Sequence, residues 1–173
     1  MPAHLNFIET ERLKLREMSE ADAAFVLEVL NDPGFVRYVG DRGVRTLEDA
    51  ARYINERFVK SYRQHGFGLW LVETKDEGLP VGICGLLNRG TLPGIEVGYA
   101  FLPPFRGQGY AFEAASAAAA HAREVLGLSR LYAIVNPDNA ISIRVLEKLG
   151  MKFESMVRLP AEESEVKLFS TDL

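Results

Sequence analysis

The sequence has a single cysteine, Cys84, among its 173 residues. An internal disulfide is therefore excluded, and a reducing, cytoplasmic location is expected. Cys84 lies in the apolar run 81–87, which reads as a strand. A small apolar thiol in such a run is expected to be buried and structural rather than nucleophilic.

Long apolar runs and an excess of positive charge are also missing. No stretch approaches the roughly 18 apolar residues of a membrane helix, and no basic segment with an apolar core opens the chain as a secretory signal would. A net charge of −4 argues against broad nucleic-acid binding, which needs a basic face. The three histidines, at positions 4, 65 and 121, are too far apart to form a metal motif. We expect no membrane, nucleic-acid or metal partner.

What the chain does have is the composition of a globular protein, with 47% hydrophobic and 25% charged residues. Its length favours one domain that spans residues 1–173. No internal repeat, low-complexity tract or linker interrupts it. A chain of this size can bury a sizeable core without disulfides or metals.

Apolar periodicity and turn residues predict strands and helices in the order β-α-α-β-β-β-α-β-α-β-β. This order implies a mixed sheet with helices packed on its faces. Ser19 with Asp22, and Thr46, have the character of helix caps, and Gly150 that of a helix end. The predicted elements lie at 7–17, 19–31, 46–65, 67–73, 80–87, 94–102, 108–126, 130–135, 139–150, 151–158 and 165–170.

The most informative segment is the turn Arg106-Gly107-Gln108-Gly109-Tyr110-Ala111, between an apolar strand and an alanine-rich helix. The first N–H groups of a helix have no intrahelical partner, and the helix dipole adds partial positive charge there. A glycine turn at that point favours phosphate binding. The turn lacks the Gly-Lys-Ser/Thr of a P-loop and the third glycine of a dinucleotide fingerprint.

The pattern R-G-x-G-x-A resembles the pyrophosphate loop of the GNAT N-acetyltransferase superfamily. A second block, Asn136 to Ser142 followed by Leu146, Lys148, Gly150 and Met151, resembles the family's next segment. The opening 9–16 is similar to the Rim-type ribosomal-protein N-terminal acetyltransferases. The resemblance implies a mixed α/β (α+β) fold with a central, mostly antiparallel sheet and helices on both faces.

The resemblance also implies acetyl-CoA as cosubstrate. The backbone N–H groups of residues 107–112 would take its pyrophosphate, and the edge of residues 99–101 its pantetheine arm. Arg106 could pair with a phosphate or be solvated, and Asn139 could contact the cofactor or cap the next helix. The predicted cofactor-binding set is Tyr99, Ala100, Phe101, Arg106, Gly107, Gln108, Gly109, Tyr110, Ala111, Phe112, Asn139 and Ser142.

The implied reaction is direct attack of a primary amine on the acetyl thioester. An α-amine with a pKa near 8 loses its proton at pH 7 for about 1 kcal/mol, whereas a lysine side chain needs about 4 to 5 kcal/mol. Glu96 is the candidate base, although it could be an outward-facing charge. Glu113 could serve the same region or simply favour the helix dipole.

The proton donor is the open part of this mechanism. In some Rim-type enzymes a tyrosine protonates the thiolate and a glutamate acts as base, but those positions here are Leu146 and Ile134, which cannot transfer protons. Ser142, bound water or Tyr132 remain as donors, and a thiolate could also leave unaided.

The sequence leaves three hypotheses for the function open. A protein N-terminus is the first hypothesis, a small amine such as a polyamine, amino acid or aminoglycoside is the second, and a non-catalytic acyl-CoA-binding module is the third. The chain could be a monomer or a homodimer. Side chains that could line an acceptor site are Arg37, Tyr38, Trp70, Glu162, Glu163 and Glu165; the three glutamates also read as a solvated turn.

Overall fold

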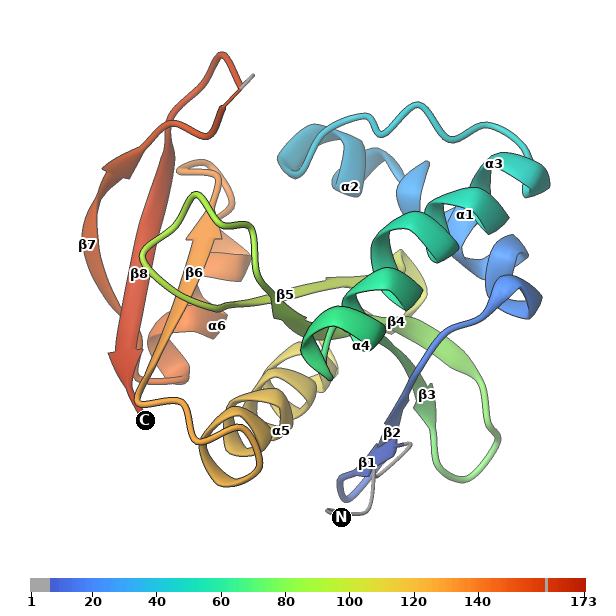
Figure 1. Cartoon of the computed structure of the whole chain (residues 1–173), viewed down its shortest axis with the longest axis horizontal. Helices are drawn as coiled ribbons and strands as arrows, with labels where there is room; N and C mark the ends of the chain where they lie inside the picture. Colours follow the sequence, from blue (N-terminus) through green and yellow to red (C-terminus); the bar gives the residue numbers. More distant parts are fainter. Residues whose placement is uncertain (1–6, 161) are drawn as a thin grey trace.

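An eight-stranded sheet forms the centre of the computed structural model, which describes residues 7–160 and 162–173 (Figure 1). Its strand order is β1-β2-β3-β4-β5-β6-β8-β7, and every neighbouring pair is antiparallel except β5 with β6. His4 lies outside the described residues. The strands are β1 (Phe7–Glu9), β2 (Leu13–Arg16), β3 (Leu69–Thr74), β4 (Pro80–Leu87), β5 (Glu96–Phe101), β6 (Arg130–Val135), β7 (Lys152–Val157) and β8 (Val166–Asp172).

Helices cover both faces of this sheet, which confirms the predicted mixed fold. One group precedes β3, and the other two helices, α5 and α6, flank β6 in sequence. The helical elements are η1 (Glu20–Asp22), α1 (Ala23–Leu30), α2 (Pro33–Tyr38), α3 (Leu47–Tyr53), η2 (Ile54–Val59), α4 (Lys60–His65), η3 (Pro103–Phe105), α5 (Tyr110–Glu124) and α6 (Ala140–Lys148).

Strand alternation assigns side chains to the two faces of the sheet. Trp70 lies opposite Cys84, and Cys84 lies opposite Tyr99, so these three side chains share one face. Trp70 packs edge-on against His121 of α5 at 5.4 Å between ring centroids, which makes this the α5 face. Glu96 and Ala100 differ from Tyr99 by an odd number of positions and therefore lie on the opposite face.

The structure adds two elements to the predicted order. The expected strand 7–17 is split, because the amide of Thr10 donates to the carbonyl of Leu13 and turns the chain between β1 and β2. The first helix ends at Leu30, as the sequence indicates, but Asp32 then caps a second short helix with Pro33 at its first position. Proline suits that position because its missing N–H would have no partner there.

The helix predicted at 46–65 is continuous, but its middle, η2, is a π-helical segment between α3 and α4. The helix predicted to start at 108 begins at Tyr110, because Gly109 still has a positive φ. Gly150 has a φ of 85° and ends α6 in the predicted left-handed conformation.

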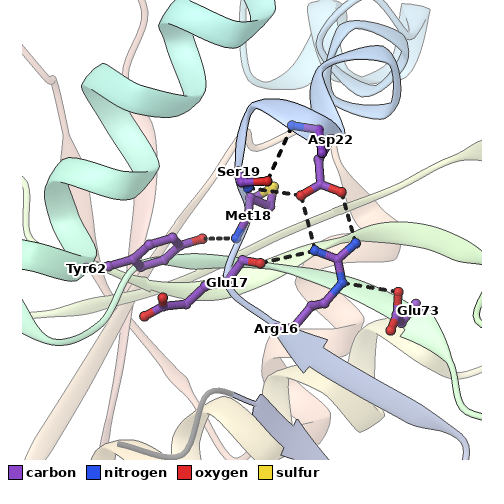
Figure 2. Close-up of polar contacts among 8 residues, drawn as sticks. Arg16, Glu17, Met18, Ser19, Asp22, Tyr62 and Glu73 are labelled. Carbon is purple, nitrogen blue, oxygen red and sulfur yellow. Dashed lines mark hydrogen bonds and ion pairs between the residues drawn. The ribbon is translucent and has the colours of Figure 1, made fainter.

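Arg16, at the end of β2, connects the sheet to the first helices (Figure 2). Its guanidinium pairs with Asp22 at 2.9 Å and Glu73 at 3.3 Å. Burial alone would raise the pKa of Asp22, but the Arg16 and Ser19 hydrogen bonds hold that pKa below its ordinary value. The Met18 amide donates to the Tyr62 hydroxyl at 3.1 Å, so α4 is tied to the same segment.

The core lies on both sides of the central strands and includes Cys84, which is fully buried and free, as predicted. Burial raises the pKa of its thiol, so the nucleophilic thiolate is disfavoured. Among the described residues, no helix is both long and apolar enough to cross a bilayer.

Candidate functional site

The sheet opens between its two parallel strands. β5 and β6 are paired only at Glu96 and Tyr132, where the Tyr132 amide donates to the Ile95 carbonyl at 2.9 Å. Beyond this point the strands diverge, with β6–β8 to the left and β2–β4 to the right in Figure 1. The second half of β5 therefore presents a free main-chain edge to the gap.

The hydrogen-bond alternation of β5 determines which main-chain groups face this gap. Leu102 donates to Val81 at 3.1 Å, so alternate residues, including Ala100 opposite Ile83, direct their N–H and C=O toward β4. Tyr99 and Phe101 direct theirs toward the gap. Of the predicted pantetheine-binding segment 99–101, only these two residues have outward main-chain groups, and Ala100 does not.

The glycine turn lies directly after this edge. Gly107 and Gly109 have φ values of 77° and 81°, a left-handed conformation that is strained for other residues. α5 starts at Tyr110, and no side chain caps it. The first amides of α5 are therefore available to a ligand, in the arrangement that favours an anion.

Arg106 makes two contacts within the protein, although its side chain is 46% exposed. Its Nε donates to the Phe101 carbonyl at 2.9 Å, and its Nη2 pairs with Asp32 at 2.6 Å. The carbonyl of Phe101 is thus already occupied, whereas the Phe101 N–H and both main-chain groups of Tyr99 remain directed at the gap. Asp32, which directly follows the predicted helix 19–31, anchors this arginine.

Glu96 is buried, with a side chain 2% exposed, so its interpretation as an outward-facing charge is wrong. The Arg89 guanidinium, from the loop before β5, pairs with its carboxylate. Burial raises the pKa of Glu96, and Arg89 partly opposes that rise. The carboxylate stands where β5 and β6 begin to diverge, on the face opposite α5.

Tyr99 and Ser142 meet on the α5 face of the gap. The two hydroxyl oxygens are 2.9 Å apart, and either can be the donor. Burial raises the pKa of Tyr99 to about 12, although the hydrogen bond with Ser142 lowers it in part. The Asn139 side-chain oxygen accepts from the Ser142 amide at 3.2 Å, so Asn139 caps α6 and its other amide atom remains as a donor.

Glu113 is held by three donors at the start of α5. Its carboxylate accepts hydrogen bonds from Thr10 Oγ1 at 2.5 Å, the Arg12 amide at 2.9 Å and Arg12 Nε at 2.7 Å. Burial would raise the pKa of Glu113, but these bonds hold it below its ordinary value. A carboxylate that is so fully engaged is a poor base, because protonation would cost these contacts.

The remaining candidates divide by burial. Leu146 is 1% exposed and lies in the core. The Tyr132 ring lies against Gly94, and Arg130 Cζ is 5.6 Å from its centroid. Trp70 is buried on the α5 face, so it does not line the face that holds Glu96. Arg37 stacks on Tyr38 at 4.9 Å; Glu162, Glu163 and Glu165 are exposed, as in a solvated turn.

Three residues that contact the candidate site residues could not be predicted from the sequence. Asp32, Arg89 and Arg12 contact Arg106, Glu96 and Glu113. Arg12 belongs to the segment 9–16, which is similar to the Rim-type enzymes. Its contact with Glu113, about a hundred positions away, does not follow from any local pattern. Arg89 is seven residues from Glu96 in a turn-rich loop, where spacing predicts no pairing.

Known proteins are similar to this chain in sequence and in fold. YkkB of Bacillus subtilis is 33% identical over 156 residues, which cover 86% of this chain and 87% of that protein. YoaA of the same organism, an N-acetyltransferase by name, is 30% identical over 87% of this chain and 85% of its own length. An acetyltransferase structure from Agrobacterium tumefaciens has a TM-score of 0.81 at 25% identity, covering 95% of this chain and 93% of that one.

One further solved structure shares the fold at lower identity, so it compares architecture alone. A RimL ribosomal L7/L12 α-N-protein acetyltransferase bound to coenzyme A has a TM-score of 0.81 at 15% identity, covering 96% of this chain and 98% of that one. The family model for an acetyltransferase (GNAT) domain matches residues 12–152. The chain therefore belongs to the GNAT acetyltransferase family.

Proposed function

We propose that this N-acetyltransferase transfers acetyl from acetyl-CoA to the α-amino group of a peptide or protein N-terminus. The observation that carries the cofactor assignment is the position of the free β5 edge beside the glycine turn. The edge offers the N–H of Phe101 and the main chain of Tyr99, and the turn offers the first amides of α5. One group suits an amide-containing arm and the other a diphosphate.

The cofactor would run along the gap between β5 and β6. Its pantetheine arm would pair with the Tyr99 and Phe101 main chain as a further strand pairs with a sheet edge. Its diphosphate would sit on the amides of residues 107–112, and the free amide nitrogen of Asn139 would donate to the arm. Arg106 would support the turn through Phe101 and Asp32 rather than by direct charge pairing.

A groove that runs along α5 from Phe112 to Arg123 provides room for the nucleotide end. It measures about 310 Å³ and runs between α5, α6 and the end of β8. Phe112 and Lys148 stand at one end, with Lys148 Nζ 4.3 Å from the Phe112 ring centroid. The ammonium suits the 3′-phosphate of CoA, and the apolar wall suits the adenine.

The chemistry divides between the two faces of β5. The neutral amine attacks the thioester carbonyl carbon, and outward N–H groups of β5 stabilise the oxyanion that forms. Glu96, on one face, accepts the proton that the amine loses. The intermediate collapses, the C–S bond breaks, and Ser142, on the other face with Tyr99, donates a proton to the thiolate. Ser142 then regains a proton from water, and Glu96 releases the amine's proton to solvent.

The acceptor class follows from the strength of this base. Glu96 is already paired with Arg89, so its basicity is divided between that partner and a substrate proton. An α-amine is freed at pH 7 for only about 1 kcal/mol, whereas a lysine side chain needs about 4 to 5 kcal/mol. A partly neutralised carboxylate is therefore adequate for the first and weak for the second.

A small polyamine is the second candidate acceptor. A spermidine N-acetyltransferase from Vibrio cholerae, solved with CoA and spermine, shares the fold at a TM-score of 0.77 and 17% identity. The specific feature in its favour is the exposed acidic turn of Glu162, Glu163 and Glu165, which could attract a cation.

A free-thiol release assay tests both. Acetyl-CoA is offered with matched peptides that have a free or a blocked N-terminus, with lysine peptides blocked at the N-terminus, and with spermidine and spermine. Turnover that depends on the free α-amine supports the proposal. Turnover with polyamines alone would replace it with the second candidate, and turnover with blocked lysine peptides alone would contradict both.

A further inference from the structure

We infer that Arg12, from the turn between β1 and β2, is a positioning residue of the anion-binding turn. It performs two tasks: it fixes one peptide plane of the turn, and it neutralises the acidic residue of the first turn of α5. This inference rests on the proposed binding of the CoA diphosphate at residues 107–112. It adds a residue from the other end of the chain to that site.

The first task follows from the contact between Arg12 and the backbone of the turn. Arg12 Nη1 donates to the carbonyl of Gln108 at 2.9 Å. Every peptide bond in the described part of the chain is trans, so the N–H of Gly109 points opposite to that carbonyl. By holding the Gln108 carbonyl on its own side, Arg12 directs the Gly109 N–H away from itself and leaves it free to meet an anion.

The glycine at this point fits the arginine as well. A Cβ on Gly109 would stand 3.3 Å from Arg12 Nη2, tighter than ordinary contact. The guanidinium also lies over the ring of Tyr110, 4.6 Å from its centroid. Arg12 thus packs against consecutive residues of the turn, and a flexible ammonium could not reproduce this planar contact.

The second task concerns charge. Glu113 is the acidic residue in the first turn of α5, close to where a diphosphate would sit. Unpaired, its negative charge would oppose phosphate binding across a few ångströms. Arg12 removes that opposition by pairing with Glu113 through both its main-chain N and its Nε.

The arginine is itself held in register. Thr10 Oγ1 accepts from the Leu13 amide at 3.0 Å and donates to Glu113 at 2.5 Å. Lys75 Nζ donates to the Thr10 carbonyl at 3.0 Å from the other side. The β1–β2 turn is therefore held between Lys75, which follows β3, and Glu113 of α5, and its arginine is presented to the glycine turn in one geometry.

Calorimetric titration of CoA into four proteins tests the inference: wild type, Arg12→Gln, Glu113→Gln and the double variant. Arg12→Gln should weaken CoA binding roughly tenfold, about the loss of one charged hydrogen bond. The double variant should bind CoA more tightly than Arg12→Gln alone, because the repelling carboxylate is gone. A brace without an electrostatic role would give a double variant no better than Arg12→Gln.

Arg52→Gln is the matched control, because Arg52 is an exposed arginine in a surface pair with Asp49 at 3.6 Å. It should leave the CoA affinity unchanged. Unaltered affinity in Arg12→Gln, or no recovery in the double variant, would overturn the inference. If the wild-type protein itself fails to bind CoA, the proposed function falls instead, so the two failures are distinguishable.

Discussion

The carboxylate of Asp32 accepts a hydrogen bond from Arg106 Nη2 at 2.6 Å, which joins the start of α2 to the residue before the glycine turn. The same carboxylate caps α2 through the Phe35 amide at 3.0 Å. Gly34 lies against the pair so closely that a Cβ there would stand 3.1 Å from Asp32 and 3.2 Å from Arg106. One buried aspartate therefore holds both the start of α2 and the arginine that precedes the glycine turn.

Replacing this aspartate should lower stability. Asp32→Ala removes a helix cap and a partly buried ion pair together, so we expect the free energy of unfolding to fall by about 1–3 kcal/mol. Urea unfolding measures it. Asp41→Ala, which removes an exposed pair with Arg45, is the control and should cost much less stability than Asp32→Ala. Equal losses in the two variants would contradict the role given to Asp32.

The glycine turn can be tested separately from backbone strain. Gly107 and Gly78 have φ values of 77° and 65°, and a Cβ on either would meet nothing within 4 Å. Alanine at either position should therefore cost a similar amount, about 1–2 kcal/mol. Only Gly107→Ala should weaken CoA binding, by roughly tenfold or more, because its methyl group occupies the space of a phosphate. Similar CoA affinities for the two variants would exclude the turn as the anion site.

The pH dependence of turnover reports on Glu96. Burial raises the pKa of Glu96 above its ordinary value of 4.5, and a base must be ionised, so kcat/KM should fall as the pH drops through that raised pKa. Glu96→Gln should lower kcat by about 10²–10⁴-fold and abolish this acidic inflection. Arg89→Ala should move the inflection to higher pH, because Arg89 opposes the rise.

The raised pKa of Glu96 also makes the stability of the fold depend on pH. A carboxyl group whose folded pKa is raised binds its proton more tightly in the folded state, so it favours folding below pH 4.5 and loses that contribution as the pH rises through the raised value. Glu96→Gln should therefore flatten the pH dependence of unfolding in this window. If the acidic inflection of kcat/KM persists in Glu96→Gln, the general base is a residue other than Glu96.

Tyr99 and Ser142 should act as one unit. If Ser142 protonates the thiolate and Tyr99 orients it, Ser142→Ala should lower kcat by up to about a hundredfold, and Tyr99→Phe by less. The double variant should be no slower than Ser142→Ala, because Tyr99 acts through the hydroxyl that is already lost. Steady-state kinetics at saturating substrates measures all three. Multiplicative losses would show that the two hydroxyls act independently.

Lys148 should distinguish CoA from 3′-dephospho-CoA. If its ammonium meets the 3′-phosphate, wild-type protein should bind CoA roughly tenfold more tightly than the dephospho form, and Lys148→Ala should bind the two alike. Lys152→Ala, an exposed lysine on β7, should preserve the wild-type ratio. A ratio of one in the wild type would remove the 3′-phosphate from the groove beside Phe112.

Local patterns predicted much of the fold because they depend on neighbours in sequence. Ser19, Thr46 and Gly150 form the helix boundaries expected of them, since capping involves residues only three or four positions apart. The hairpin of β1 and β2 was not predicted, because it depends on a contact between residues that are far apart in the sequence. Its turn depends on a Thr10 side chain that is fixed by Glu113, which belongs to α5.

The site shows a similar division. The glycine turn lies at the start of a helix, as the sequence indicates, and its two left-handed glycines follow from the chemistry of that residue. The burial of Glu96 did not follow from the sequence, since alternation along a strand does not show which face of the sheet will be covered. Its 2% exposure and its pairing with Arg89 in the folded chain were needed to show that this carboxylate is not solvent-facing.

The sequence by itself determined the family, most of the element order and the place of the glycine turn, because each is encoded over a few residues or in blocks of fixed spacing. The tertiary structure alone decided that Asp32 holds Arg106, that Arg89 pairs with Glu96, that Arg12 reaches the turn, and that β5 parts from β6 at Glu96. Such contacts join segments that are brought together only when the sheet closes its core, and charge pairing acts through distance in space rather than along the chain.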